Sequence, residues 1–291
     1  MLISVSELLK RAAILYRDNF ATLLKYLLLT LIPAAVLTGI ISAVFLIPVF
    51  LSTPWSDLRL WQIAAIVIVV GVIVIIASIA SMWLNFNLMR VIGKLYRRET
   101  VDSVAITTKQ STKVLWKGIG TSIVSGLYVI GPFLAACVLF YLHQYAIPEI
   151  GNNPIFHALN IVVGILLGLL ALYGVVHLVI FSIKLTFAVY ETVIAEKPVR
   201  GSLDFSLTMT KNRWGAILWR LLGTIIAVMA VYLIAAFILN IPFSLLLEKS
   251  VAHTIAGFLS QLISFFITPF AMAAGIILYE EVKKLGPAQK V

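Results

Sequence analysis

Six long stretches of this chain contain no Asp, Glu, Lys or Arg, and the shortest of them has 27 residues. They cover residues 26–56, 60–89, 118–148, 150–183, 221–247 and 250–279. About 20 apolar residues in a helix span the hydrocarbon core of a bilayer. The runs are continuous rather than alternating, which excludes a transmembrane β-barrel. The stretches therefore predict an all-α, polytopic membrane protein with six transmembrane helices.

Composition excludes a soluble globular chain, because 62% of the residues are hydrophobic and only 12% are charged. The first 20 residues contain Glu7 and Asp18 and lack a compact apolar core. We therefore expect no cleaved signal peptide. Cys137 is the one cysteine, so it cannot form an internal disulfide.

The positive charges are strongly segregated between alternate loops. Of the 22 Lys and Arg residues, 20 fall in the N-terminal segment, the segments 90–117 and 184–220, and the tail, and only Arg59 and Lys249 fall elsewhere. The positive-inside rule then places both termini and both long loops in the cytoplasm. We expect a multi-pass protein of the plasma (inner) membrane whose net charge of +10 favours anionic lipid headgroups over nucleic acid.

An Ile-Pro dipeptide recurs at nearly one-third intervals, and an aromatic residue precedes it at similar spacing each time. The pairs are Phe20 with Pro48, Trp116 with Pro148 and Trp214 with Pro242. Three parallel repeats follow, over about 1–98, 99–195 and 196–291, each a cytoplasmic amphipathic helix and a helical hairpin within a single membrane domain. Parallel repeats predict a pseudo-threefold bundle. The alternative is that proline is simply common at helix ends.

Amphipathic patterns precede two of the three hairpins. Val5, Leu8, Ala12 and Leu15 share one face of the first segment, and Leu203, Leu207, Thr210 and Trp214 follow helical spacing in the third. The middle segment, rich in Thr and Ser, shows the pattern weakly. Such helices either lie at the membrane interface or pack on the cytoplasmic ends of the bundle.

Polar residues within the apolar runs are few. They are Asn85, Asn87, Asn160, His177, Asn240 and Gln261. They serve either as hydrogen bonds between helices or as part of a transport path. The small residues Gly118, Ser122 and Gly126, and the pair Gly164 and Gly168, predict close packing of helices within the bundle, with homodimerisation as the alternative.

Nothing in the sequence indicates catalysis. No nucleophile elbow, phosphate-binding loop or zinc-protease motif occurs, and the spacing of His143 and His157 fits no standard zinc site. We therefore predict a protein that is not an enzyme, with no catalytic, cofactor-binding or metal-ligating residues.

The segment "VIAEKPVRGSLDFSLTMTKNRWGAILWRLLG" combines a Glu turn, Gly201-Ser202-Leu203, Ser206, a basic cluster and Trp214 at the start of an apolar run. It resembles the family of six-helix proteins that includes the glycerophosphoryl diester phosphodiesterase membrane domain and the YciC-like uncharacterised inner-membrane proteins. The resemblance is sharpest over about 190–225, and this chain has Ser-Leu where the family usually has Ala-Leu. It implies an integral membrane domain without known catalytic residues. Some members carry a soluble phosphodiesterase domain, which we do not expect here.

The leading hypothesis is a non-enzymatic membrane protein whose basic cytoplasmic face binds anionic lipid headgroups or a partner protein. The alternative is a transporter of lipids or small molecules with a central intramembrane cavity. The candidate lipid-contacting residues are Arg17, Phe20, Lys113, Trp116, Lys211, Arg213 and Trp214.

Overall fold

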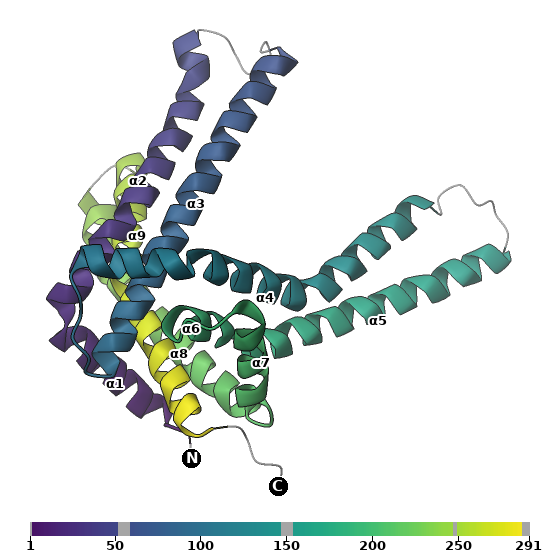
Figure 1. Ribbon diagram of the computed structural model, residues 1–291. Coiled ribbons are helices and arrows are strands. Elements are labelled where there is room, and N and C mark those ends of the chain that lie inside the picture. The colour runs from purple at the N-terminus through teal and green to yellow at the C-terminus, as the bar shows by residue number, and fades with distance from the viewer. Residues whose placement is uncertain (1, 52–58, 147–153, 247–248, 287–291) are drawn as a thin grey trace. The chain divides into compact units, whose positions relative to one another are not determined.

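The computed structural model describes residues 2–51, 59–146, 154–246 and 249–286, and none of these residues forms a strand (Figure 1). The helices in the described part of the chain are α1 (Val5–Asp18), α2 (Phe20–Leu51), α3 (Leu60–Tyr96), α4 (Val104–Ala146), α5 (Pro154–Leu185), α6 (Ala188–Ile194), α7 (Val199–Thr210), α8 (Trp214–Leu246) and α9 (Lys249–Lys284). The all-α prediction is confirmed. The Ile-Pro at 147–148 lies outside the described residues.

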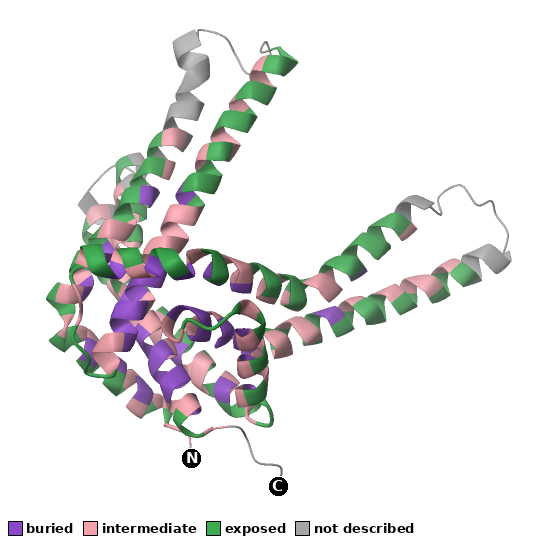
Figure 2. Ribbon diagram, in the orientation of Figure 1, coloured by how far each residue is buried: buried purple, intermediate pink, exposed green. Residues whose placement is uncertain are grey.

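Six of these helices, α2, α3, α4, α5, α8 and α9, contain segments long and apolar enough to cross a membrane, as predicted. They are also longer than a bilayer needs. The 37 residues of α3 extend over about 55 Å, against a hydrocarbon core of about 30 Å. The surplus in α3 is its C-terminal part, where residues such as Phe86, Asn87 and Val91 are buried by protein. Its N-terminal part is largely exposed along its length (Figure 2).

The chain divides into two compact units. The α5 unit comprises Met1–Leu2, Lys117–Leu221 and Tyr279–Val291, and the α3 unit comprises Ile3–Trp116 and Leu222–Leu278. The boundaries between the units pass through α4, α8 and α9, rather than between the predicted repeats.

In the α3 unit, α2 and α3 lie side by side as a hairpin (Figure 1). Helix α1 buries Leu8, Ala12 and Leu15. Its Val5 lies so close to Gly223 of α8 that a Cβ on the glycine would be 2.7 Å from the Val5 side chain. The apolar face of α1 therefore packs on protein, which favours the packing alternative over an interfacial helix.

A tyrosine also ties α1 to α9. The hydroxyl of Tyr16 donates to the carbonyl of Phe266 at 3.1 Å. That carbonyl lies three residues before Pro269, whose ring interrupts the backbone hydrogen bonds of α9. Tyr16 thus supplies a donor one residue from the Phe265 carbonyl, which would have accepted the N–H that Pro269 lacks.

The second predicted repeat has no separate cytoplasmic helix, because α4 runs unbroken for 43 residues through Trp116. In the other two repeats the helix is interrupted before the span. The interruption lies at Asn19, between α1 and α2, and at Asn212, between α7 and α8, where φ is 59°. Asparagine tolerates such non-helical conformations. The position in α4 that corresponds to Asn212 is Val114, which is buried and stays helical.

In the α5 unit, α4 and α5 lie side by side as a second hairpin (Figure 1). The hydroxyls of Thr121 and Thr192 hydrogen-bond at 2.8 Å. Further along the hairpin, a Cβ on Gly174 would lie 2.9 Å from the backbone of Phe133. Among the described glycines of α4 and α5, Gly174 therefore marks the closest approach of the two helices.

Of the four glycines singled out by the sequence, Gly118 is buried, but the other three do not have this role. Gly126, Gly164 and Gly168 have nothing within 4 Å of where a Cβ would lie. The prediction that these glycines pack helices together within the chain is wrong, because their faces of α4 and α5 are open.

Of the face predicted for α7, only Thr210 is buried. The residues that α7 buries are Ser202, Ser206 and Thr210, whereas Leu203 and Leu207 are only half-buried. The small polar side chains allow α7 to approach the end of α5 closely, and the hydroxyls of Ser206 and Thr210 lie within hydrogen-bond distance of the Lys184 carbonyl.

Candidate functional site

A buried carboxylate lies just beyond the end of α5. Glu191 is in the short helix α6, and its side chain has no solvent exposure. It is the one charged residue within the segment "LTFAVYETVIA", which covers 185–195. An ionised group in such a position is costly unless it is paired and hydrogen-bonded.

Helix α7 fixes the backbone around this carboxylate. The hydroxyl of Ser206 donates to the carbonyl of Lys184 at 2.7 Å and accepts from the N–H of Phe187 at 3.2 Å. The hydroxyl of Thr210 lies 2.8 Å from the carbonyl of Ser206 and 3.3 Å from that of Lys184. Polar groups at the junction of α5 and α6 are thereby satisfied, as burial requires.

Three side chains converge on Glu191 within the α5 unit. The ammonium of Lys197 lies 2.7 Å from Oε1, and the ammonium of Lys283 lies 3.2 Å from Oε2. The hydroxyl of Tyr279 donates to Oε2, and Lys283 donates in turn to that hydroxyl at 3.0 Å. The C-terminal turns of α9 are therefore bonded to α6 through one carboxylate.

An aromatic ring holds the two lysines from another side. The ammonium groups of Lys197 and Lys283 lie 4.8 Å and 5.6 Å from the centre of the Phe205 ring, and Lys283 also lies 5.3 Å from that of Tyr279. These are cation–π distances. We call Glu191, Lys197, Phe205, Tyr279 and Lys283 the Glu191 cluster.

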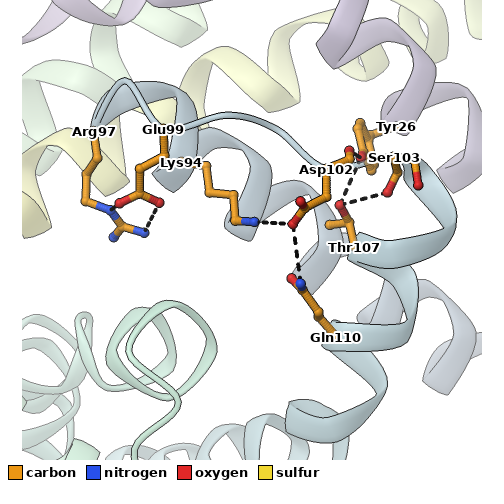
Figure 3. Close-up of polar contacts among 8 residues, drawn as sticks. All are labelled: Tyr26, Lys94, Arg97, Glu99, Asp102, Ser103, Thr107 and Gln110. Atoms are coloured by element: carbon orange, nitrogen blue, oxygen red, sulfur yellow. Dashed lines mark hydrogen bonds and ion pairs between the residues drawn. The ribbon is translucent and has the colours of Figure 1, made fainter.

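A second polar network joins α3 to α4 in the α3 unit (Figure 3). The ammonium of Lys94 lies 2.5 Å from the carboxylate of Asp102, and Gln110 donates to the same oxygen at 3.3 Å. The buried hydroxyl of Tyr26 lies 3.2 Å from the carbonyl of Asp102 and 3.1 Å from the hydroxyl of Thr107. Asp102 thus connects the end of α3, the start of α4 and the start of α2.

Ion pairing lowers the pKa of two carboxyl groups at this junction. The ammonium of Lys94 holds the pKa of Asp102 below its usual value. The guanidinium of Arg97, 2.6 Å from Glu99, does the same for the pKa of Glu99. Both carboxylates are therefore ionised at neutral pH, and the junction positions the first turns of α4.

The predicted lipid-contacting residues are separated between the two units. Arg17, Phe20, Lys113 and Trp116 belong to the α3 unit, and Lys211, Arg213 and Trp214 to the α5 unit. Phe20, Trp116 and Trp214 are exposed by 40%, 70% and 39%. Arg17, Lys113 and Lys211 are exposed as well, although Arg17 also pairs with Asp18.

Arg213 differs from the other predicted cations. Its guanidinium donates to the carbonyl of Gly286 at 2.9 Å, just past the end of α9. The side chain is half-buried and satisfies a carbonyl at a helix terminus. At least one of its donors is therefore committed within the protein.

The polar residues within the apolar runs also have different roles. The amides of Asn85 and Asn240 donate to carbonyls four residues earlier in their own helices, those of Ser81 and Ala236. His177 stacks on Phe181 with ring centres 4.2 Å apart. Asn87 is only 1% exposed, and neither of its amide atoms has a hydrogen-bond partner among the described residues.

Sequence reasoning missed Glu191 because the uncharged run ends at Lys184, which suggests that the helix has left the membrane. The helical span continues to Ile194. A signal was present, since a single acidic residue surrounded by apolar ones predicts a buried, paired carboxylate. Its partner Lys283 lies 92 residues away and could not be inferred.

Comparison with family models, with curated proteins and with solved structures finds no match to this chain.

Proposed function

We propose that this chain is a non-enzymatic, multi-pass membrane protein whose basic cytoplasmic face binds anionic lipid headgroups. One observation supports this function above others. An exposed cation precedes an exposed aromatic residue by three positions at Arg17 and Phe20, at Lys113 and Trp116, and at Lys211 and Trp214. The three aromatic residues lie two to seven residues before the uncharged runs that begin at residues 26, 118 and 221.

The chemistry of these pairs suits the headgroup layer. Trp rings favour the boundary between hydrocarbon and water, and Lys or Arg stems extend from there to the phosphates. Each cation near an anionic leaflet contributes about 1 kcal/mol of attraction. Since 20 of the 22 Lys and Arg residues fall on the predicted cytoplasmic side, the attraction adds up on one face.

Backbone geometry supports the proposed threefold repeat. A residue in the left-handed region follows the second helix of each repeat: Arg98 with φ of 58°, Glu196 with φ of 58° and Gly286 with φ of 65°. Such residues end helices by directing the chain away from the axis. We propose that the three repeats share this way of ending their second helix. We also propose that the chain belongs to the family that residues 190–225 resemble.

The test uses the full-length protein reconstituted into vesicles of mixed phosphatidylglycerol and phosphatidylcholine. The protein is extracted in neutral detergent, and the lipids retained per protein are measured. We expect phosphatidylglycerol to be enriched over its share in the vesicles. Lys113→Gln should reduce the enrichment, by up to about fivefold at that site, because a cation at the headgroup level is lost.

Lys113→Arg is the matched control, since it keeps the charge at the same position and should retain the enrichment. A retained lipid fraction identical to that of the vesicles would contradict the proposal, and would favour a protein partner for the basic face.

Transport is the second candidate, and Asn87 is the observation that favours it. Buried amides almost always find a partner, in protein, water or ligand. Asn87 has none among the described residues, so a polar guest beside α3 would satisfy it. Asn87→Leu distinguishes a transport site from a dry, packed site. If a polar molecule normally binds the amide, the substitution should lower the free energy of unfolding, because that molecule no longer binds. In a dry, packed site it should raise the free energy of unfolding by about 1 kcal/mol.

A further inference from the structure

The Glu191 cluster contains more positive charge than its buried carboxylate requires. One ammonium is enough to neutralise Glu191, yet both Lys197 and Lys283 pair with it. Neither lysine has another acidic partner in the described part of the chain. The cluster therefore has a net charge of +1.

The two ammonium groups also have donors to spare. Each has three N–H groups. Lys283 uses one for Glu191 and one for Tyr279, and the ion pair of Lys197 with Glu191 occupies at most one more. At least three donors are left, and they lie close together because both ammonium groups bind the oxygens of one carboxylate and both lie over Phe205.

The lysines are accessible from outside the protein, whereas the carboxylate is not. The side chains of Lys197 and Lys283 are exposed by 46% and 39%, and that of Glu191 by 0%. An approaching anion therefore meets the ammonium groups first. The Glu191 carboxylate, together with Phe205, holds them in place beforehand, which lowers the entropic cost of binding.

The position of the cluster matches a headgroup. Lys283 lies in the last turn of the sixth span, and Glu191 lies near the end of the fourth. Basic groups between helices at the cytoplasmic boundary are typical sites for phosphate-bearing headgroups. Lysine ammonium groups bind phosphate oxygens through charge-assisted hydrogen bonds.

We propose that Lys197 and Lys283 form a specific binding site for one phosphate group, either a phosphodiester of an anionic lipid or a soluble phosphate. The inference rests on the proposed function, because it names one defined site within the basic face. The site binds without any covalent step.

The experiment measures binding of phosphatidylglycerol and phosphatidylcholine to the full-length protein in neutral detergent by native mass spectrometry. The variant Lys197→Gln, Glu191→Gln and Lys283→Gln combined removes the site without leaving a buried charge unpaired. It lowers the net charge by one, and so does the control Lys109→Gln, at an exposed lysine of α4. We expect the triple variant to lose at least about a hundredfold in phosphatidylglycerol affinity, since two charge-assisted hydrogen bonds are lost.

Glu191→Gln alone provides a second, independent readout. It raises the charge of the cluster from +1 to +2, so phosphatidylglycerol should bind at least as tightly as in the wild type. Phe205 still lies against both ammonium groups in this variant, and the amide oxygen of residue 191 can accept from one of them. Weaker binding of phosphatidylglycerol than in the wild type would contradict a site formed by the two lysines. Thermal unfolding of each variant checks that it is folded.

The outcomes separate this site from the proposed function. Equal, small losses in the triple variant and in Lys109→Gln would overturn the site and leave the basic face intact. No preference of the wild type for phosphatidylglycerol would overturn both. Inorganic phosphate that displaces the lipid from the wild type would show that soluble phosphate also binds there. A failure to displace it would restrict the site to lipid.

Discussion

Asp102 is the residue that connects three helices of the α3 unit, through Lys94 and Gln110 on its side chain and Tyr26 on its carbonyl. A substitution of Asp102 should therefore weaken the packing of α2, α3 and α4 at this junction together. The junction also fixes the direction in which α4 begins, and hence the exposure of Lys113 and Trp116 further along that helix.

The pH dependence of this junction follows from its ion pair. Lys94 lowers the pKa of Asp102 in the folded protein, so the unfolded chain binds the proton more tightly. The stabilisation is present above the unfolded pKa of about 3.9 and is lost as pH falls through the lower folded pKa. We expect Asp102→Asn to lower the melting temperature at pH 7 and to lessen its decrease in acid, as measured by thermal unfolding in detergent.

Asp204→Asn is the control for this prediction, because Asp204 is exposed and no side-chain partner is described for it. It should leave the dependence of melting temperature on pH unchanged. An Asp102→Asn protein with the wild-type profile would show that the junction does not depend on the ion pair.

At the scale of elements, the α4–α5 hairpin depends on one glycine. A Cβ on Gly174 would lie 2.9 Å from the backbone of Phe133, whereas one on Gly168, in the same helix, meets nothing within 4 Å. Gly174→Ala should destabilise the protein by about 1–3 kcal/mol through overpacking. Gly168→Ala should be neutral or stabilise by up to about 1 kcal/mol through helix propensity. Thermal unfolding of the two variants compares them directly, and equal effects would refute this assignment.

The elements themselves could be predicted from sequence far better than their contacts. Uncharged length alone indicates six helices, because the bilayer imposes both length and composition on a span. The pairing of Gly174 with Phe133 could not be predicted, since small residues are common in membrane helices and only the crossing point selects among them.

Helices α4 and α7 show two further limits. Helix α4 continues through Trp116, and Val114 occupies the position where the other two repeats have Asp18 and Asn212. The repeat pattern predicts a helix end there and does not take this single-residue difference into account. Burial of Ser206 and Thr210 reverses the usual expectation because both hydroxyls lie within hydrogen-bond distance of the Lys184 carbonyl in α5. Apolar periodicity detects neither effect.

At the scale of the whole molecule, the account depends on the direction in which the spans enter the membrane. Of the 22 Lys and Arg residues, 20 lie in alternate loops of the sequence. By the positive-inside rule, this distribution predicts that the segments 90–117 and 184–220 lie on the same side of the membrane. The exposed cations and aromatic rings of the proposed lipid-binding face, and the Glu191 cluster, would then all meet the same leaflet. If the segments lay on opposite sides, no shared basic face would exist.

Cysteine accessibility tests this claim most directly. Single cysteines replace Lys109, Lys211 and Arg59, all exposed residues, in a Cys137→Ser background, and a membrane-impermeant thiol reagent is applied to sealed vesicles of known orientation. We predict that Lys109→Cys and Lys211→Cys react only from the cytoplasmic side and Arg59→Cys only from the opposite side. Labelling of Lys109→Cys and Lys211→Cys from opposite sides would contradict it.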